Sequence, residues 1–330
     1  MNRQLLISAL LLSGMTACGQ SPGNVDAPVR VSELADEYYS WLLQRSPEEA
    51  YFAGVELERH DGMFDNSPEA QLDAQQFEDA LYEKVRAIDM DALAGSPDWI
   101  TLAYLQQQLA SSIGLRVCRS ELWGVNQMGG WHLAYSQVAQ LQPAGTAELR
   151  QQALDRWSKF PAFVDQEIAN LETGLSLGFS SPRAVVARVV EQVDGLLALP
   201  ATESPFFSVT TRDTHAEFAE DMLELVEQRI NPALRRYRDF LVDVYLDAAR
   251  SELSVTANPD GSACYEASLR AYTTVDRSGR NVFELGRSVV DANAETVIEL
   301  GRAAYGFEEF SEIIESVKSD PADRFASRED

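Results

Sequence analysis

The sequence is poor in the residues that build most catalytic sites. Its 330 residues include three histidines and three cysteines. It contains no His-Glu-x-x-His, Gly-x-Ser-x-Gly, phosphate-loop Gly-Lys-Ser/Thr or Cys-x-x-Cys motif, the patterns of zinc peptidases, serine hydrolases, nucleotide-binding loops and thiol redox sites. His60, His132 and His215 are widely spaced, and none has a second histidine at ligand spacing. We therefore predict no catalytic residue and no metal ligand within this chain.

Positive charge is also scarce. The chain has 27 Lys and Arg against 52 Asp and Glu, a formal net charge of −25. Nucleic-acid binding depends on cationic contacts to phosphate, so this balance argues against a nucleic-acid partner and against electrostatic docking on an anionic membrane. The same abundance of carboxylates prevents the choice of any one acid–base pair.

No apolar run is long enough to cross a bilayer, which takes about 20 residues. The run Leu5 to Leu12 instead follows a short N-terminus containing Arg3 and precedes small residues and Cys18. This order is typical of a bacterial lipoprotein signal. We predict a signal peptide over residues 1–17 and lipidation of Cys18, with Gly19 favouring the periplasmic face of the outer membrane within the cell envelope. The alternatives are an ordinary signal peptide cut near Ala17, or a short membrane anchor.

Lipidation of Cys18 would leave two cysteines in an oxidising compartment. We predict that Cys118 and Cys264 form a disulfide. A bridge across this separation contributes roughly 4–5 kcal/mol in the chain-entropy treatment. The alternative is a pair of buried free thiols.

The hydrophobic pattern is helical, and alternating strand patterns with hairpin turns are absent. We predict a flexible tether over residues 18–30 and a mainly α, multi-helix, single elongated helical body over residues 31–330. Four Ser-Pro pairs, at positions 46, 67, 96 and 181, resemble helix starts. Further helices are expected at 147–159, 162–176, 183–198, 214–250 with a break or kink at Asn231-Pro232, 281–305 and 308–318. Residues 117–131 and 253–276 are expected to be irregular.

Both irregular stretches carry side chains suited to binding a peptide. Asn126 and Gln127 lie among glycines and tryptophans. Their carboxamides can donate and accept hydrogen bonds, and the glycines would let a ligand approach the backbone closely. The second stretch places a cation, a phenol and two hydroxyls together. Its candidate substrate-binding residues are Arg270, Tyr272, Thr273 and Thr274. The alternative for both stretches is structural, with polar groups tying loops to helices.

Several segments resemble the bacterial proteins grouped as domain of unknown function 885, within the zincin-like metallopeptidase clan. The similarity spans nearly all of the chain after the signal, and the order and spacing of the motifs make it more specific than any one motif. The segments that carry it are 46–54, 65–69, 123–130, 156–161, 174–178, 182–183, 204–206 and 258–274.

The resemblance implies a mostly helical, cleft-containing fold and a zinc-dependent hydrolase of peptidase type. The family's metal motif, a His-Glu pair followed by Pro-Gly-His-His, lies further toward the C-terminus, and no residue here matches it. We therefore expect the N-terminal, substrate-cleft half of a lipid-anchored envelope protein, inactive alone. Zinc is expected only in the missing catalytic half, and the expected partners are the membrane, a peptide substrate and that half. The alternative is a complete, non-enzymatic helical lipoprotein that binds a peptide or protein partner.

Overall fold

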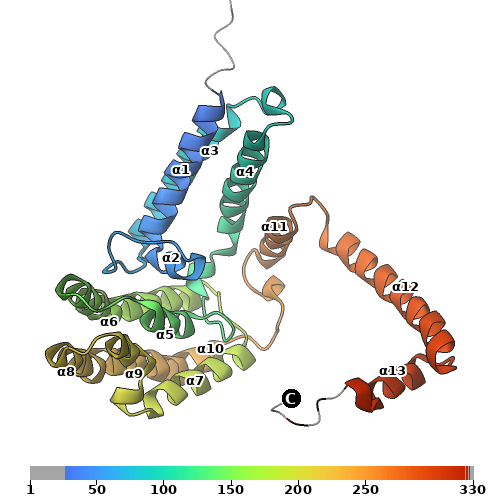
Figure 1. Ribbon diagram of the computed structural model, residues 1–330. Helices are drawn as coiled ribbons and strands as arrows, with labels where there is room; N and C mark the ends of the chain where they lie inside the picture. Colours follow the sequence, from blue (N-terminus) through green and yellow to red (C-terminus); the bar gives the residue numbers. More distant parts are fainter. Residues whose placement is uncertain (1–26, 324, 326, 328–330) are drawn as a thin grey trace, which may run out of the picture.

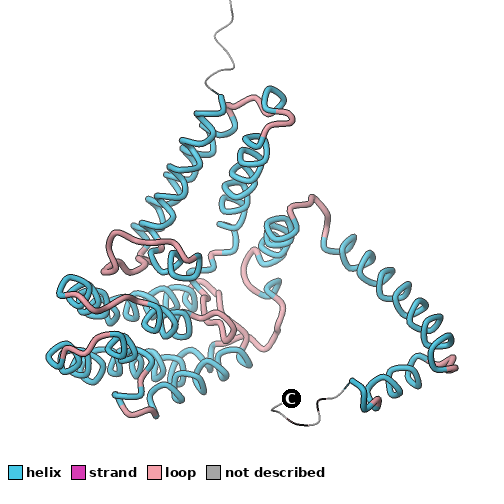
Figure 2. The backbone as a smooth tube through the Cα atoms, in the orientation of Figure 1, coloured by secondary structure: helices cyan, strands magenta, loops and turns pink. Residues whose placement is uncertain are grey.

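The computed structural model describes residues 27–323, 325 and 327, so the predicted signal peptide and the Cys18 lipidation site lie outside the described residues. The protein is mainly helical (Figures 1 and 2). The described residues form no strand, and one isolated bridge pairs Pro182 with Arg250. No helix in this part of the chain is both long and apolar enough to cross a membrane.

The longer elements are α1 (Ala27–Arg45), α2 (Pro47–Ala53), α3 (Pro68–Arg86), α4 (Pro97–Leu115), α5 (Trp131–Leu141), α6 (Ala147–Ser176), α7 (Arg183–Ala198), α8 (Ala216–Leu225), α9 (Asn231–Phe240), α10 (Leu246–Ala248), α11 (Gly261–Thr273), α12 (Gly279–Tyr305) and α13 (Phe310–Ser319). The short or π-helical turns are η1 (Asp91–Leu93), η2 (Arg116–Cys118), η3 (Ser120–Leu122), η4 (Ala201–Glu203), η5 (Pro205–Arg212), η6 (Val226–Ile230), η7 (Leu241–Tyr245), η8 (Val255–Ala257) and η9 (Pro321–Asp323).

One core lies between α1, α3 and α4. On α3, Leu81 and Val85 lie four residues apart and are buried, and Ile88, just after the helix ends, is buried in the same core, which places one apolar stripe against the neighbouring helices. The rings of Trp41 and Phe77 stack with centroids 4.5 Å apart at one end of this core. These three helices form the upper part of the view in Figure 1.

A second, larger core lies among α5 to α9 and η5. Trp157 and Phe160 of α6 are fully buried, as is Phe206 of η5. The centroid of the Phe206 ring lies 5.3 Å from that of Trp157 and 5.1 Å from that of Phe160. Such edge-on and tilted arrangements are favourable for aromatic rings. The helices around this core fill the lower part of Figure 1.

The last three helices are arranged differently. α11 lies beside α4, whereas α12 runs away from this junction and α13 folds back beside its far end (Figure 1). Ile313 of α13 is buried against Gly301 of α12, where a Cβ atom would collide with the isoleucine side chain. We call α12 and α13 together the C-terminal arm.

The structure corrects several details of the sequence prediction. α1 begins at Ala27, inside the predicted tether, and α11 occupies a stretch expected to be irregular. The predicted helices at 147–159 and 162–176 are one helix, α6, with Pro161 inside it. Of the break or kink expected at Asn231-Pro232, the break is absent: the helical path continues from the π-helical turn η6 into α9, and the wider turn accommodates the missing N–H. At the Ser-Pro starts, only Ser67 caps its helix through its side chain, accepting from the backbone N–H of Ala70 at 3.2 Å.

Candidate functional site

A cavity of about 600 Å³ lies where α11 packs against α4. Four other cavities on the described surface measure about 300 to 430 Å³. The wall on one side comes from α3 and α4, and the other from α11 and the turn that leads into α12. The lining residues are Tyr82, Ala110, Ile113, Gly114, Glu266, Ala267, Arg270, Asp276, Arg277 and Ser278.

Two arginines supply the positive charge of this cavity. Arg270 and Arg277 are both exposed, and neither forms an ion pair or side-chain hydrogen bond with another described residue. The Glu266 carboxylate is engaged elsewhere, because it accepts from the backbone N–H of Gly279 at 3.0 and 3.2 Å and so holds the first turn of α12. Two guanidinium groups are therefore available beside an apolar wall, an arrangement suited to a carboxylate attached to a small apolar group.

A disulfide fixes α11 in this position. The predicted bridge between Cys118 and Cys264 is present, with both cysteines buried and their Cα atoms 4.7 Å apart. The peptide carbonyl of Cys118 also accepts from the indole N–H of Trp123 at 2.8 Å. The start of α11 is tightly packed, since a Cβ atom on Gly261 would collide with the carbonyl of Val255. The wall that carries Arg270 is therefore covalently tied to the end of α4.

The other predicted residues of α11 do not line this cavity. Tyr272 is 84% exposed. The Thr273 hydroxyl donates to the carbonyl of Leu269 at 2.6 Å. Thr274 ends the helix in the left-handed region, at φ +60°. Only Arg270 of this group lies in the cavity, and the substrate role of the other three stays a prediction.

The second predicted segment is held by internal hydrogen bonds. The Asn126 side-chain oxygen accepts from the backbone N–H groups of Met128 and Gly129, at 2.8 and 3.3 Å. The carbonyl of Gln127 accepts from the side-chain amide of Gln192 at 3.0 Å. Neither Asn126 nor Gln127 lines the cavity beside α11, so the structure does not gather the predicted residues into one site. Their substrate role also stays a prediction.

His132 completes this hydrogen-bonded chain. It is buried, and its Nε2 lies 2.9 Å from the side-chain oxygen of Gln192. Burial lowers the pKa of His132, which keeps the ring neutral near pH 7. Gly130 is required beside it, because a Cβ atom there would meet the ring. These contacts give His132 a role in holding the loop before α5.

A buried polar cluster that could not be predicted from the sequence joins α2, α5 and α6. The Glu48 carboxylate is buried and accepts from the hydroxyl of Tyr135 at 2.9 Å and from the backbone N–H of Phe64 at 3.0 Å. The Arg156 guanidinium is fully buried over the ring of Tyr51, 5.0 Å from its centroid. The only signal for Arg156 in the sequence was its place at the start of the 156–161 motif, directly before Trp157, which does not distinguish a buried cation from an exposed one.

His60 extends the same cluster. Its Nδ1 lies 2.7 Å from the Tyr51 hydroxyl, and its backbone N–H donates to the side-chain oxygen of Gln152 at 2.7 Å. Burial lowers the pKa of His60, and the nearby Arg156 charge lowers it further. The cluster fixes the loop after α2 against α6 and α5.

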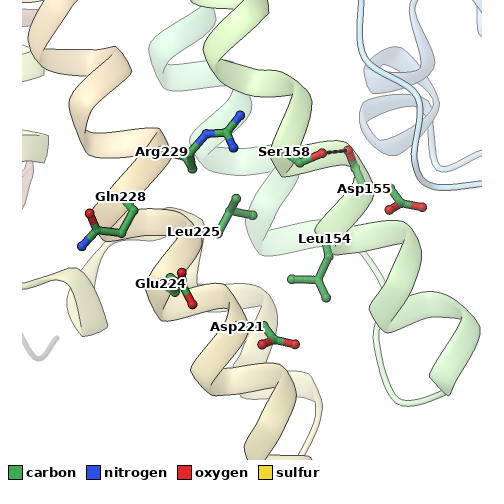
Figure 3. Close-up of a pocket in the computed structure, with 8 residues that line it drawn as sticks. All are labelled: Leu154, Asp155, Ser158, Asp221, Glu224, Leu225, Gln228 and Arg229. Atoms are coloured by element: carbon green, nitrogen blue, oxygen red, sulfur yellow. Dashed lines mark hydrogen bonds between the residues drawn. The ribbon is translucent and has the colours of Figure 1, made fainter.

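The described residues provide no ligand set for zinc. No group of three or more His, Cys, Asp or Glu side chains among them is placed to hold a metal ion. The three histidines lie in separate elements and are each engaged: His215 Nδ1, for example, accepts from the backbone N–H of Phe218 at 3.4 Å. A cavity of about 330 Å³ between α6 and α8 is lined by several carboxylates and Arg229 (Figure 3), but these do not form such a group either.

The chain matches the model of one protein family, described as "Bacterial protein of unknown function (DUF885)", over residues 47–330. The chain belongs to this DUF885 family. A search of curated proteins found no match. The fold is similar to the crystal structure of a "putative lipoprotein" from Colwellia psychrerythraea, with a TM-score of 0.76 and 16% sequence identity. That match covers 90% of this chain and 55% of the Colwellia chain, so this DUF885 chain spans about half the length of the solved protein.

Proposed function

We propose that this chain is the substrate-binding part of a lipid-anchored envelope protein of peptidase type, and that the cavity beside α11 binds the C-terminal carboxylate end of a peptide. The observation that carries the proposal is the pair of unpaired guanidiniums, Arg270 and Arg277, in a cavity of about 600 Å³. A carboxylate would accept charge-assisted hydrogen bonds from either arginine. The apolar side chains of α4 would contact the last side chain of the peptide.

The proposal assigns hydrolysis to another, catalytic part of the protein and not to the residues that the structure describes. Zinc catalysis requires about three protein ligands and an open position for water, and the described residues do not supply such a set. The purified chain is therefore expected to bind peptides without cleaving them. Zinc-dependent cleavage of a peptide by the purified chain would contradict this assignment.

Peptide binding is tested with a fluorescein-labelled Ala-Ala-Leu-Ala tetrapeptide, with the label at its N-terminus, and with its C-terminal amide. Fluorescence anisotropy should show tighter binding of the free acid. Arg270→Gln should weaken binding of the acid by roughly tenfold, as expected for loss of a hydrogen bond to a charged group. The matched control is Arg235→Gln, which removes an exposed arginine of α9. Equal affinity for acid and amide, or equal effects of the two variants, would refute carboxylate binding in this cavity.

The envelope location rests on the lipobox around Cys18. Cys18→Ala should release the protein from the membrane fraction and abolish incorporation of a labelled fatty acid. Retention of the variant in the outer-membrane fraction would contradict lipid anchoring at this residue.

A non-enzymatic role in binding a protein partner is the second candidate. The exposed apolar face of the C-terminal arm favours it, because a monomer seldom leaves a large contiguous apolar surface in water. Different substitutions distinguish the two functions. Substitutions in the arm should affect partner binding, and Arg270→Gln should affect peptide binding.

A further inference from the structure

The C-terminal arm exposes an apolar face along most of its length. α12 has 27 residues, and at about 100° per residue its exposed large apolar side chains fall on roughly half of the helix circumference. Val290 and Leu300 are each 65% exposed and Phe283 is 63% exposed. A helix with this pattern normally buries its apolar side against another element. The exposed large side chains of α12 are Phe283, Leu285, Val289, Val290, Leu300 and Tyr305.

The described part of the chain does not cover this face. α13 packs beside the far end of α12, through Ile313 and Gly301. At the near end, α12 contacts α11. Between these ends the helix runs free of the two cores, as Figures 1 and 2 show.

Charge indicates what can cover the face. Residues 279–320 carry nine carboxylates and four cations, and the whole chain has a net charge of −25. A second copy would bring the same negative charge against the arm and be repelled. A partner with Lys and Arg beside its own apolar stripe would gain both burial and charge complementarity.

The fold comparison offers a candidate for such a partner. The match leaves 45% of the Colwellia chain without a counterpart in this chain. We propose that the apolar face of α12 is the docking surface for a helical polypeptide with an apolar stripe and basic flanks, equivalent to that unmatched part. This inference rests on the proposed function, which assigns catalysis to another part of the protein. It adds the surface of this chain that the catalytic part would contact.

The start of the C-terminal arm borders the cavity beside α11. The turn that begins α12 contains Asp276, Arg277 and Ser278, which line the cavity. The backbone N–H of Gly279, the first residue of α12, is held by Glu266 of α11. A polypeptide docked along α12 would therefore lie next to the peptide site, as a cleft with two walls requires.

The test uses two synthetic 27-residue helical peptides with the same leucine stripe, one flanked by lysines and the other by glutamates. Each is labelled and titrated with the full chain by fluorescence anisotropy. The basic peptide should bind at least about tenfold more tightly than the acidic one. Val290→Glu and Leu300→Glu should each weaken binding of the basic peptide by about tenfold or more, because they place a charge in the apolar contact. Val244→Glu, at an exposed valine of η7 away from the arm, should have no such effect.

The variants also separate docking from simple charge attraction. Each glutamate adds negative charge, so binding driven by charge alone would become tighter in Val290→Glu. That result, or equal binding of the two peptides, would overturn the proposal. Light scattering of the full chain tests the other occupant: a dimer that Val290→Glu dissociates would assign the face to a second copy and also overturn the proposal. Neither measurement uses the tetrapeptide, so the peptide site and the docking surface can each fail alone.

Discussion

Glu167 should make the stability of the protein depend on pH in a direction opposite to that of most carboxylates. This side chain of α6 is buried, 8% exposed, and accepts from the side-chain amide of Asn66 at 2.6 Å. Burial raises its pKa from the ordinary 4.5 to about 7, although the Asn66 hydrogen bond acts in the other direction. Asn170 of the same helix donates to the carbonyl of Asn66 at 2.9 Å, which fixes the loop against α6.

The sign follows from proton binding. The folded state binds this proton more tightly than the unfolded state, so Glu167 contributes stability below pH 4.5 and loses that contribution as the pH rises through about 7. The difference between the two pKa values corresponds to roughly 3 kcal/mol. Between pH 5 and pH 8.5, most of this amount is lost, about 2–3 kcal/mol. The titration of Glu167 also bears on Tyr237, whose pKa is raised first by burial and then by the nearby Glu167 charge.

Glu167→Gln removes the titration and leaves a side-chain oxygen that can accept from Asn66. Its free energy of unfolding, measured by urea titration with circular dichroism, should rise relative to the wild type by about 2–3 kcal/mol between pH 5 and pH 8.5. The informative quantity is how the difference in unfolding free energy between variant and wild type changes from pH 5 to pH 8.5. Packing effects of the substitution are the same at both pH values and therefore cancel. Glu172→Gln, at an exposed position of the same helix, should show a flat difference. A flat difference for Glu167→Gln as well would refute the reasoning.

Two further predictions concern the packing of the fold. Reduction of the Cys118–Cys264 bridge should lower the free energy of unfolding by up to about 4–5 kcal/mol, and thiol titration of the denatured, unreduced protein should find neither cysteine free. Gly174→Ala should destabilise the protein by about 2 kcal/mol, because its Cβ atom would collide with the carbonyl of Leu122. Gly195→Ala, an exposed position of α7 with nothing near the added Cβ, should instead stabilise it by up to about 1 kcal/mol; equal effects of the two alanines would contradict this account.

The positions of helices could be predicted from the sequence where the apolar periodicity was strong. α7 was expected over residues 183–198 and is found at Arg183–Ala198, and α12 and α13 begin within two residues of their expected starts. α11 was missed because its first turns are small and polar, so no apolar stripe marks them. Directly before α11 the backbone is irregular, as expected, because Asp260 lies in the left-handed region at φ +51°. Only the helix that follows was unexpected.

Tertiary packing decided the remaining errors. Proline inside a helix costs about 3 kcal/mol, and Pro161 was therefore expected to separate two helices. It is buried in α6 beside the aromatic core around Phe160, and the burial of helix positions on both sides of it offsets that cost. The candidate site likewise depends on tertiary packing that the sequence does not show. Arg270 was predicted from composition, but Arg277 was not, because only the packing of α11 against α4 brings both into one cavity.

Arg270 and Arg277 stay unpaired in a chain that is rich in carboxylates. Acidic groups outnumber basic ones almost two to one, and several other arginines of the described surface do form ion pairs. Arg116, Arg150, Arg236 and Arg238 all form ion pairs at 3 Å or less. Arg277 has Asp276 beside it in the sequence and still forms no ion pair with it. The cavity beside α11 therefore keeps two guanidinium groups available for a carboxylate ligand, although Glu266 and Asp276 also line it.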